Sequence, residues 1–230
     1  MAFAVGVSVG RAGEPSAIAV LEVTPTRCEE TYSVTVIDPS NPIDRPYEAR
    51  RSRWVETAPC SFAVRHLERF AAGASYTAMA ERAADVVRRL PDPDALTILD
   101  ITGVGRPVLA LFVRYGLDPI PATIMAGGRP TLVHGGYAIP KGDLISLLQI
   151  ALHDERLKIS SALPDAGTLR AELVNFRPAA AGPIDTEAWR EGAHDDLVRA
   201  VAVAAFVAED LYSRTPPAPT VEFEDELEYT

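Results

Sequence analysis

The sequence predicts a single α/β domain in which helices cover a mixed β-sheet. Three observations support this fold class. Two apolar, β-branched stretches lie close together near the N-terminus, and a third follows a proline-rich interval. Strand-like stretches then alternate with helical ones through the rest of the chain. With 230 residues, 47% of them hydrophobic, the chain is long and apolar enough for one ample core.

The first part of the chain carries three predicted strands. Residues 3–9 and 16–24 are apolar runs separated by glycines and a proline, which predicts a hairpin of buried strands. Residues 61–70 alternate apolar with charged side chains, which suits a third strand with one wetter face. Between them, residues 38–59 contain four prolines and four arginines. We expect an excursion or long loop here, whose arginines either meet phosphates or pair with nearby glutamates in solvent.

The second part predicts helices and strands in alternation. A helix over residues 75–90 has apolar side chains at helical spacing and is stopped by prolines. A short buried strand over 96–101 leads through a glycine-rich turn into a helix over 106–115. The remaining elements are a strand over 121–125, a glycine-rich hairpin over 127–139, and helices over 141–153, 164–176 and 194 to about 213.

The charge of the chain limits the kind of partner it binds. A formal net charge of −10 argues against a protein that grips nucleic acid over a large surface. Part of this charge lies in residues 214–230, a proline-led acidic stretch that is predicted to be a disordered tail. Without this tail the body of the protein is only mildly acidic.

Nothing in the sequence predicts export or a membrane. We find no charged-then-apolar leader with a cleavage site, and the longest apolar run, 200–207, is too short to cross a bilayer. Cys28 and Cys60 make no metal-type pair, so a cytoplasmic protein with reduced thiols is expected, with a single disulfide as the alternative. The GxxxxGK[ST] pattern of P-loop ATPases is absent from the sequence.

Three acidic residues are candidates for a catalytic or metal-binding site. Asp100 closes an apolar strand, where a buried carboxylate must be paired, hydrogen-bonded or bound to metal. Asp195 and Asp196 open the last predicted helix, where the helix dipole stabilises acids in any case. If the fold brings these acids together, divalent cations would make the cluster tolerable, as in a metal-dependent phosphodiesterase. A capping role at a turn or a helix start is the alternative for each acid.

Other candidate residues carry weaker signals. His194 is of a type that is more often a polar packing residue than a ligand. Lys141 begins a helix, where the dipole disfavours its charge, so a substrate contact competes with a plain exposed lysine. Gly103 and Gly105 resemble a phosphate-binding loop only weakly, because sharp strand-to-helix turns need glycine anyway.

The order of the segments resembles the nuclease domain of phage large terminase subunits, the DNA-packaging motor proteins. The resemblance covers most of residues 3–213 and rests on several motifs in the same order. These motifs are Gly10 with residues 15–22, then residues 64–70, 99–108, 140–144, 156–159, 172–176 and 189–198. The resemblance implies an RNase H-like domain over residues 1–213 with a five-stranded mixed sheet flanked by helices.

The resemblance also implies a metal centre. Acids on the first strand, the central strand and the last helix would hold two Mg²⁺ or Mn²⁺ ions, about 3.5–4 Å apart in sites of this kind. Asp100 matches the central-strand acid, and Asp195 and Asp196 match the final pair. Asp196 is the favoured ligand because it leads the apolar run of the helix.

The resemblance further suggests which side chains contact DNA and which partners the chain has. Lys141, Arg106 and His194 are the candidate DNA contacts. The implied partners are duplex DNA and a separate packaging ATPase or portal component, because the chain has no ATPase motif of its own. The implied location is the cytoplasm, that of the host cell if a phage or prophage encodes the chain.

Ser8 departs from the family's pattern, since it stands where the first-strand aspartate is expected. A serine hydroxyl is neutral and is a poor substitute for a carboxylate toward a hard cation. Two hypotheses therefore stay open. The chain is a two-metal endonuclease that cuts duplex DNA with little sequence preference, or it is a catalytically inactive RNase H-like module that binds DNA or a partner.

Overall fold

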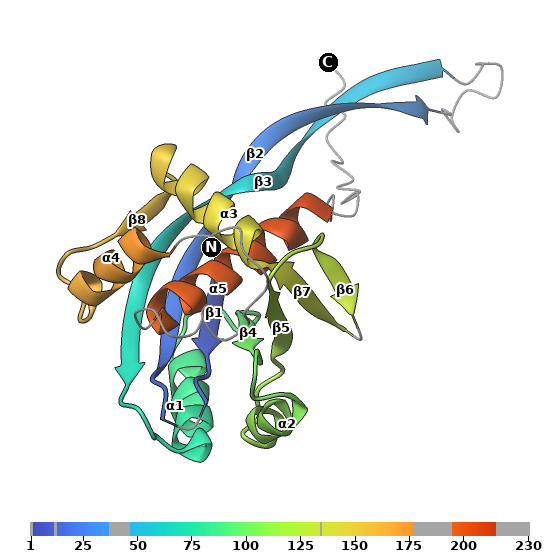
Figure 1. Cartoon of the computed structure of the whole chain (residues 1–230). Coiled ribbons are helices and arrows are strands. Elements are labelled where there is room, and N and C mark those ends of the chain that lie inside the picture. Colours follow the sequence, from blue (N-terminus) through green and yellow to red (C-terminus); the bar gives the residue numbers. More distant parts are fainter. Residues whose placement is uncertain (1, 12, 37–46, 134, 177–194, 215–230) are drawn as a thin grey trace.

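A single eight-stranded sheet organises the chain, with the strand order β6-β7-β5-β4-β1-β2-β3-β8 (Figure 1). The computed structural model describes residues 2–11, 13–36, 47–133, 135–176 and 195–214. The strands are β1 Ala2–Ser8, β2 Ser16–Val36, β3 Tyr47–Phe70, β4 Leu96–Asp100, β5 Ile120–Met125, β6 Thr131–Val133, β7 Gly136–Pro140 and β8 Leu157–Ile159. The helices of this described part are α1 Tyr76–Arg88, α2 Arg106–Arg114, α3 Lys141–His153, α4 Ala166–Asn175 and α5 Asp196–Arg214.

The strand pairing confirms a mixed sheet but corrects its size. β1 and β2 pair antiparallel, as the predicted N-terminal hairpin requires, whereas β1, β4, β5 and β7 run parallel to one another. The prediction of five strands was wrong, since the sheet has eight. β6 and β8 have three residues each, which is too short for an alternating pattern to reveal a strand.

Helices cover both faces of the sheet, and the alternation of side chains along β1 shows how. Phe3, Val5 and Val7 belong to the core under α1 and α2. Ala4 belongs to the opposite core, under α3, α4 and α5. A Cβ atom added to Gly6 would lie 1.9 Å from the backbone oxygen of Ala200, so α5 packs directly on the backbone of β1. Small residues on one face of β1 therefore set how closely the last helix approaches the centre of the sheet.

The two longest strands leave the sheet together as an arm. β1 pairs with β2 only as far as Val23, and β8 pairs with β3 only at residues 62–64. Beyond these points β2 and β3 continue as a two-stranded ribbon that projects from the body (Figure 1). We call residues 24–36 and 47–61 the arm.

The arm corrects the prediction of an excursion or loop over residues 38–59. Residues 47–59 belong to β3, and residues 47–57 pair antiparallel with β2 up to a register shift between Thr24 and Thr26. Most described side chains of the arm are exposed, and only Val55 and Cys60 among them are buried, so the sequence shows no regular alternation of apolar and polar residues. That alternation is the signal from which strands are predicted, which is why the pattern missed this half of β3. Residues 38–46 of the predicted excursion fall largely outside the described residues.

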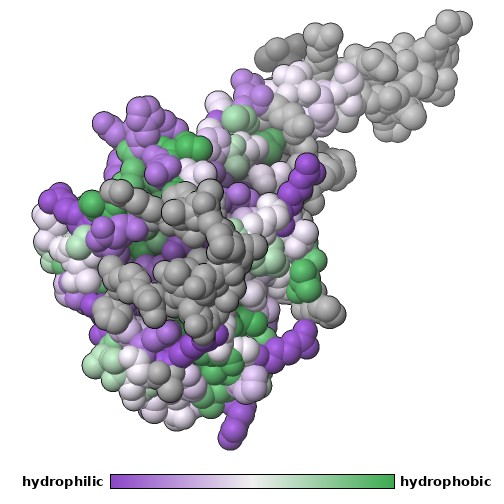
Figure 2. Space-filling model, in the orientation of Figure 1, coloured by the Kyte–Doolittle hydropathy of each residue, from purple (hydrophilic) through white to green (hydrophobic). Residues whose placement is uncertain are grey.

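Several other boundaries match the sequence closely. α3 has the predicted bounds, and α1 begins after Ser75, whose hydroxyl accepts a hydrogen bond from the Ala78 amide at 3.1 Å. In the described chain, no helix is both long and apolar enough to span a membrane. The face seen in Figure 2 mixes hydrophilic and hydrophobic residues in small patches. The predicted acidic tail lies outside the described residues apart from Arg214, which ends α5.

Candidate active site at the end of the central strands

The sheet brings Ser8 and Asp100 side by side. β1 and β4 are parallel neighbours, and these two terminal residues are partners in the register. Both are buried, with Ser8 1% and Asp100 0% exposed. Side chains alternate along a strand, so Ser8 shares the face of Ala4 and Gly6, and Asp100 that of Ile98. This is the face that α5 covers, so both residues look toward the first turns of the last helix.

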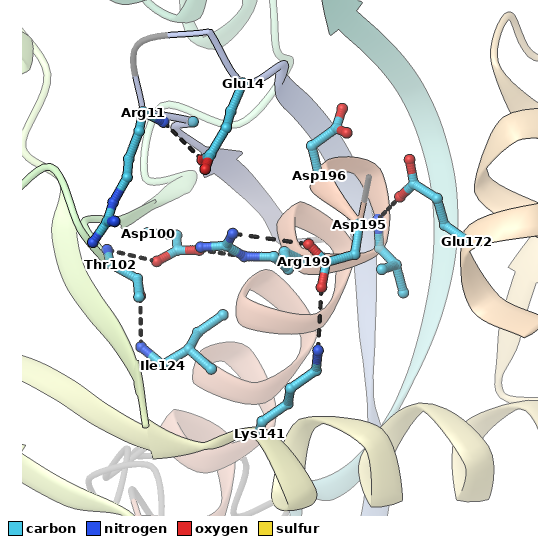
Figure 3. A network of polar contacts seen from close by, with 12 residues as sticks. Arg11, Glu14, Asp100, Thr102, Ile124, Lys141, Glu172, Asp195, Asp196 and Arg199 are labelled. Carbon is cyan, nitrogen blue, oxygen red and sulfur yellow. Dashed lines mark hydrogen bonds and ion pairs between the residues drawn. The ribbon is translucent and has the colours of Figure 1, made fainter. Parts of the chain in front are cut away.

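Asp100 is fully hydrogen-bonded by protein groups. Its Oδ1 accepts from the Thr102 amide at 2.9 Å, in a turn typical of aspartate. Its Oδ2 accepts from Arg199 Nε at 2.9 Å and also from a terminal nitrogen of the same guanidinium (Figure 3). The Thr102 hydroxyl in turn accepts from the Ile124 amide at 2.7 Å, which ties the turn to β5. The charge of this buried carboxylate is therefore neutralised from α5.

Arg199 is the residue that sequence reasoning missed. It lies within the first turns of α5, and its side chain is 13% exposed. Burial alone lowers the pKa of Arg199, but the carboxylates of Asp100 and Asp195 outweigh it and raise the pKa above its ordinary value. Its second terminal nitrogen lies 3.9 Å from Asp195 Oδ1. One guanidinium thus lies between an acid of the central strand and an acid of the helix start.

Lys141 joins the same cluster from α3. Its Nζ donates to Asp195 Oδ2 at 3.3 Å and lies 4.7 Å from the centre of the Phe176 ring. The side chain is 13% exposed, so it is not the freely solvated lysine that was the alternative in the sequence. The structure places Lys141 beside the candidate acids, as a DNA-contacting lysine would require.

Asp196 points to a different partner. Arg69, near the end of β3, donates to both of its carboxylate oxygens, each at 2.9 Å. This hydrogen-bonded pairing with Asp196 raises the pKa of Arg69 despite its partial burial. Asp196 is 4% exposed, so this ion pair holds the start of α5 against the end of β3. Arg69 was not predicted, since it stands among the charged residues of an alternating strand.

Glu172 is a further buried acid of the site that the sequence did not reveal. It lies on α4, is 5% exposed, and accepts a hydrogen bond from the Val198 amide at 2.9 Å. Its other oxygen, Oε1, has no hydrogen-bond partner. Burial raises the pKa of Glu172 to about 8, against the opposing effect of the Val198 amide. At neutral pH this residue is therefore mostly a neutral carboxylic acid that holds α4 against the first turn of α5.

Arg106, another predicted DNA contact, lies outside this cluster. Arg106 begins α2 and lines a separate cavity of about 390 Å³ with Ile101 and Thr123. Within the described contacts, none joins Arg106 to the acids of the site. His194 lies outside the described residues. Arg11 was not among the predicted contacts but lies close to the turn after β4. A Cβ atom added to Gly103 in this turn would be 2.5 Å from Arg11 Nε.

The residues of this site do not fit the two-metal centre that the family resemblance implies. Each of the three predicted acids already has its own cation, namely Arg199 for Asp100, Lys141 for Asp195 and Arg69 for Asp196. Over the described ranges, no group of three or more histidines, cysteines, aspartates or glutamates is arranged to hold a metal ion. Ser8 adds no charge beside Asp100. The arrangement is a set of buried ion pairs at the position where a nuclease would need open carboxylates.

The fold is that of terminase nuclease domains. The human cytomegalovirus terminase nuclease domain, in a Mn-soaked structure, aligns with a TM-score of 0.52 at 13% sequence identity, over 92% of this chain and 86% of that chain. The large terminase nuclease of the thermophilic phage G20c aligns with a TM-score of 0.49 at 18% identity, over 88% of this chain and 80% of that chain. No protein-family model and no curated protein matches the sequence. At such identities the likeness establishes the fold and leaves the chemistry to the residues of the site.

Proposed function

We propose that this chain is a terminase nuclease-type domain that has lost two-metal catalysis and acts as a binding module. The observation that carries the proposal is the Asp100–Arg199 pair beside Ser8. Ser8 provides no charge where the family's first acid is expected. Both oxygens of Asp100 are taken by protein donors. The site is therefore stable without a metal ion.

Arg199 also opposes metal binding by its charge. A divalent cation near Asp100 would face a buried guanidinium, and like charges repel strongly where water is excluded. The ion would have to displace Arg199 from a carboxylate with which it makes charge-assisted hydrogen bonds. The absence of an acid at position 8 and the presence of a basic partner at position 199 support the same interpretation. Together they replace metal charge with side-chain charge.

The net charge favours a protein partner over duplex DNA. A net charge of −10 works against binding to nucleic acid, whose affinity for proteins comes largely from contacts between basic side chains and phosphates. In a packaging system, a separate packaging ATPase or a portal component is the partner that the fold suggests. Duplex DNA would contact the module near Lys141, if at all.

The second candidate function is an Mg²⁺- or Mn²⁺-dependent endonuclease that cuts duplex DNA with little sequence preference. One observation favours it. Asp100 and Asp195 come from separate elements, and both contact Arg199, while Asp196 follows directly in the chain. The central-strand and last-helix acids implied by the resemblance thus lie at one end of the sheet, and Ser8 together with the cationic partners closes the site.

Plasmid cleavage with Mn²⁺ separates the two candidates. We compare the native chain, Ser8→Asp, Arg199→Ala and the double variant, with Asp100→Asn added to the double variant as a control. We expect no cleavage by the native chain and a clear gain only in the double variant, because one change restores charge and the other frees Asp100. Strong native cleavage that Asp100→Asn abolishes would establish the endonuclease instead.

Thermal unfolding gives a second measurement that does not depend on activity. A ligand that binds only the folded state raises its stability, by about 2.7 kcal/mol when present at 100 times its Kd. The native Tm should be the same with Mn²⁺ and with EDTA. The Ser8→Asp, Arg199→Ala variant should instead be stabilised by Mn²⁺. A native Tm that rises with Mn²⁺ at micromolar concentrations would contradict the proposed loss of the metal site.

A further inference from the structure

The opposite end of the sheet carries a second concave site. A groove of about 1180 Å³ lies where β1, β4 and α5 end away from Asp100, at the root of the arm. Its floor is apolar, with Phe3, Leu96, Leu211 and Tyr212 among the lining side chains. Trp54 on the arm forms a wall. The groove is as large as the pockets that hold sizeable ligands.

Trp54 is the most exposed large apolar side chain in the described structure, at 69%. It stands on a two-stranded ribbon, and such ribbons are marginally stable in water without a further strand or a covering element. Tryptophan is also a residue type that carries a large share of binding energy at interfaces. An exposed tryptophan beside an apolar floor is therefore a surface that a partner would bury.

Unpaired backbone N–H and C=O groups of β2 lie along the same groove. The pairing of β1 with β2 ends at Val23, and Thr24 and Pro25 line the groove just beyond. The edge of β2 on this side is unpaired in the described part of the arm. An extended segment can continue the line of β1 along this edge by strand addition. The occupant that fits is an extended peptide, more than a compact small molecule.

The charge of the groove points to a basic occupant. Arg27 and Glu56 neutralise each other at 3.1 Å. Asp92 accepts hydrogen bonds from the amides of Phe3 and Asp94, each at 3.0 Å. Asp94 is exposed at the rim. Among the described lining residues acids outnumber bases, which attracts a cationic segment and repels nucleic acid or a second copy of this acidic chain.

We propose that this groove docks an extended segment of a partner protein that carries an apolar anchor flanked by lysine or arginine. The anchor side chain lies between Trp54 and Tyr212, and the basic residues face Asp92 and Asp94. This inference goes beyond the proposed function, because the groove is remote from Asp100 and serves an active or an inactive nuclease domain alike. Cleavage assays and docking assays can therefore fail independently.

Fluorescence anisotropy tests the proposal on the full chain. The probe is a fluorescein-labelled peptide of alternating leucine and lysine, compared with the same peptide carrying glutamate in place of lysine. We expect saturable binding of the basic peptide only, weakened by added salt. Trp54→Ser should weaken binding about tenfold or more, as loss of a central anchor at an interface does. Asp94→Lys, at the rim, should weaken binding less and reduce its salt dependence. Ile150→Ser, at another exposed apolar residue, and Asp118→Lys, at another exposed acid, are the matched controls and should change binding less than twofold.

A spectroscopic variant locates the contact directly. The sequence has two tryptophans, so Trp189→Phe leaves Trp54 as the only one. Binding of the basic peptide should then shift the tryptophan emission to shorter wavelength, because Trp54 leaves water. Equal binding of the basic and acidic peptides, or binding that Trp54→Ser leaves intact, would overturn the proposal. Self-association in sedimentation experiments that Trp54→Ser abolishes would overturn it too, since a second copy would then occupy the groove.

Discussion

The two ends of the central sheet differ in how their polar and apolar groups are satisfied. β1, β4 and α5 each run from one end to the other, with Asp100 at one end and the Trp54 groove at the opposite end. At the Asp100 end, the three predicted acids are each paired with a cation, and only Glu172 Oε1 is buried without a hydrogen-bond partner among the described residues. At the groove end, the Trp54 side chain is exposed to water beside an apolar floor with acidic residues next to it. If the groove docks a partner as proposed, the binding surface of this chain lies at the end of the sheet opposite to the candidate site implied by the fold.

The largest expected effect on stability tests whether the Asp100–Arg199 pair stabilises the fold. Asp100→Ala leaves Arg199 as a buried cation without its partner, and such losses cost about 3–5 kcal/mol of stability. Urea unfolding measures this change. Adding Arg199→Leu should recover most of the loss, because an apolar pair of similar volume replaces a buried ion pair at little cost. A loss below about 1 kcal/mol for Asp100→Ala would mean that the pair is not buried as a unit.

The next effect concerns the proton on Glu172. The pKa of Glu172 is about 8 in the folded state, against an ordinary value of 4.5, so the native state holds a proton that the unfolded chain releases. Stability is then full below the ordinary value and falls as pH rises toward 8, by at most about 1.4 kcal/mol per pH unit. Glu172→Gln should flatten this slope, measured by urea unfolding at several pH values. Glu81→Gln, at an exposed acid of α1, should leave the slope unchanged.

A smaller effect is expected where the two arginine pairs of β3 differ in burial. Arg69 makes a forked contact with buried Asp196, whereas Arg65 contacts Glu22 with a side chain that is 58% exposed. Lysine cannot reproduce the fork, so Arg69→Lys should cost about 1–2 kcal/mol. Arg65→Lys should cost about zero, because exposed ion pairs contribute little. Equal losses of unfolding free energy for the two variants in urea would show that burial does not set the contribution of the ion pair to stability.

The smallest effect on stability is expected at the groove itself. Trp54 is 69% exposed, so Trp54→Ser should change the free energy of unfolding by less than about 0.5 kcal/mol. Phe3, on the floor of the groove and 8% exposed, is the contrast, because Phe3→Ala should cost about 3 kcal/mol or more. A large loss for Trp54→Ser in urea unfolding would make this residue part of the core and not a binding surface.

The sequence predicted the sheet's centre well, for reasons that are local. Strand β4, the turn after it and helix α3 follow from apolar periodicity, glycine and proline positions, and their bounds agree with the structure to within about one residue. The resemblance to terminase nuclease domains is likewise confirmed for the fold. Convergence of Asp100 with the start of α5 was an expectation from that resemblance, and the chain places them on one guanidinium.

The partners of those acids could not be predicted. Arg199 and Asp100 are distant in sequence, and nothing local distinguishes Arg199 from a solvated arginine on a helix. Arg69 and Glu172 are likewise assigned by which edge of the sheet and which helix meet α5. The arm was missed for a different reason, since most of its described side chains are exposed and impose no regular burial pattern on the sequence. Contacts between segments that are distant in the sequence decide which residue neutralises each of these charges.

The contact between Gly6 and the backbone of Ala200 has a consequence for redesign. Because helix and strand touch without side chains between them, α5 has no room to slide along β1 when nearby residues are exchanged. Position 8 lies two residues beyond this contact, and position 199 lies immediately before it. The spacing between an introduced carboxylate and the helix is thus preset by the backbone. Hydrolytic chemistry could be rebuilt on this scaffold by exchanging side chains alone.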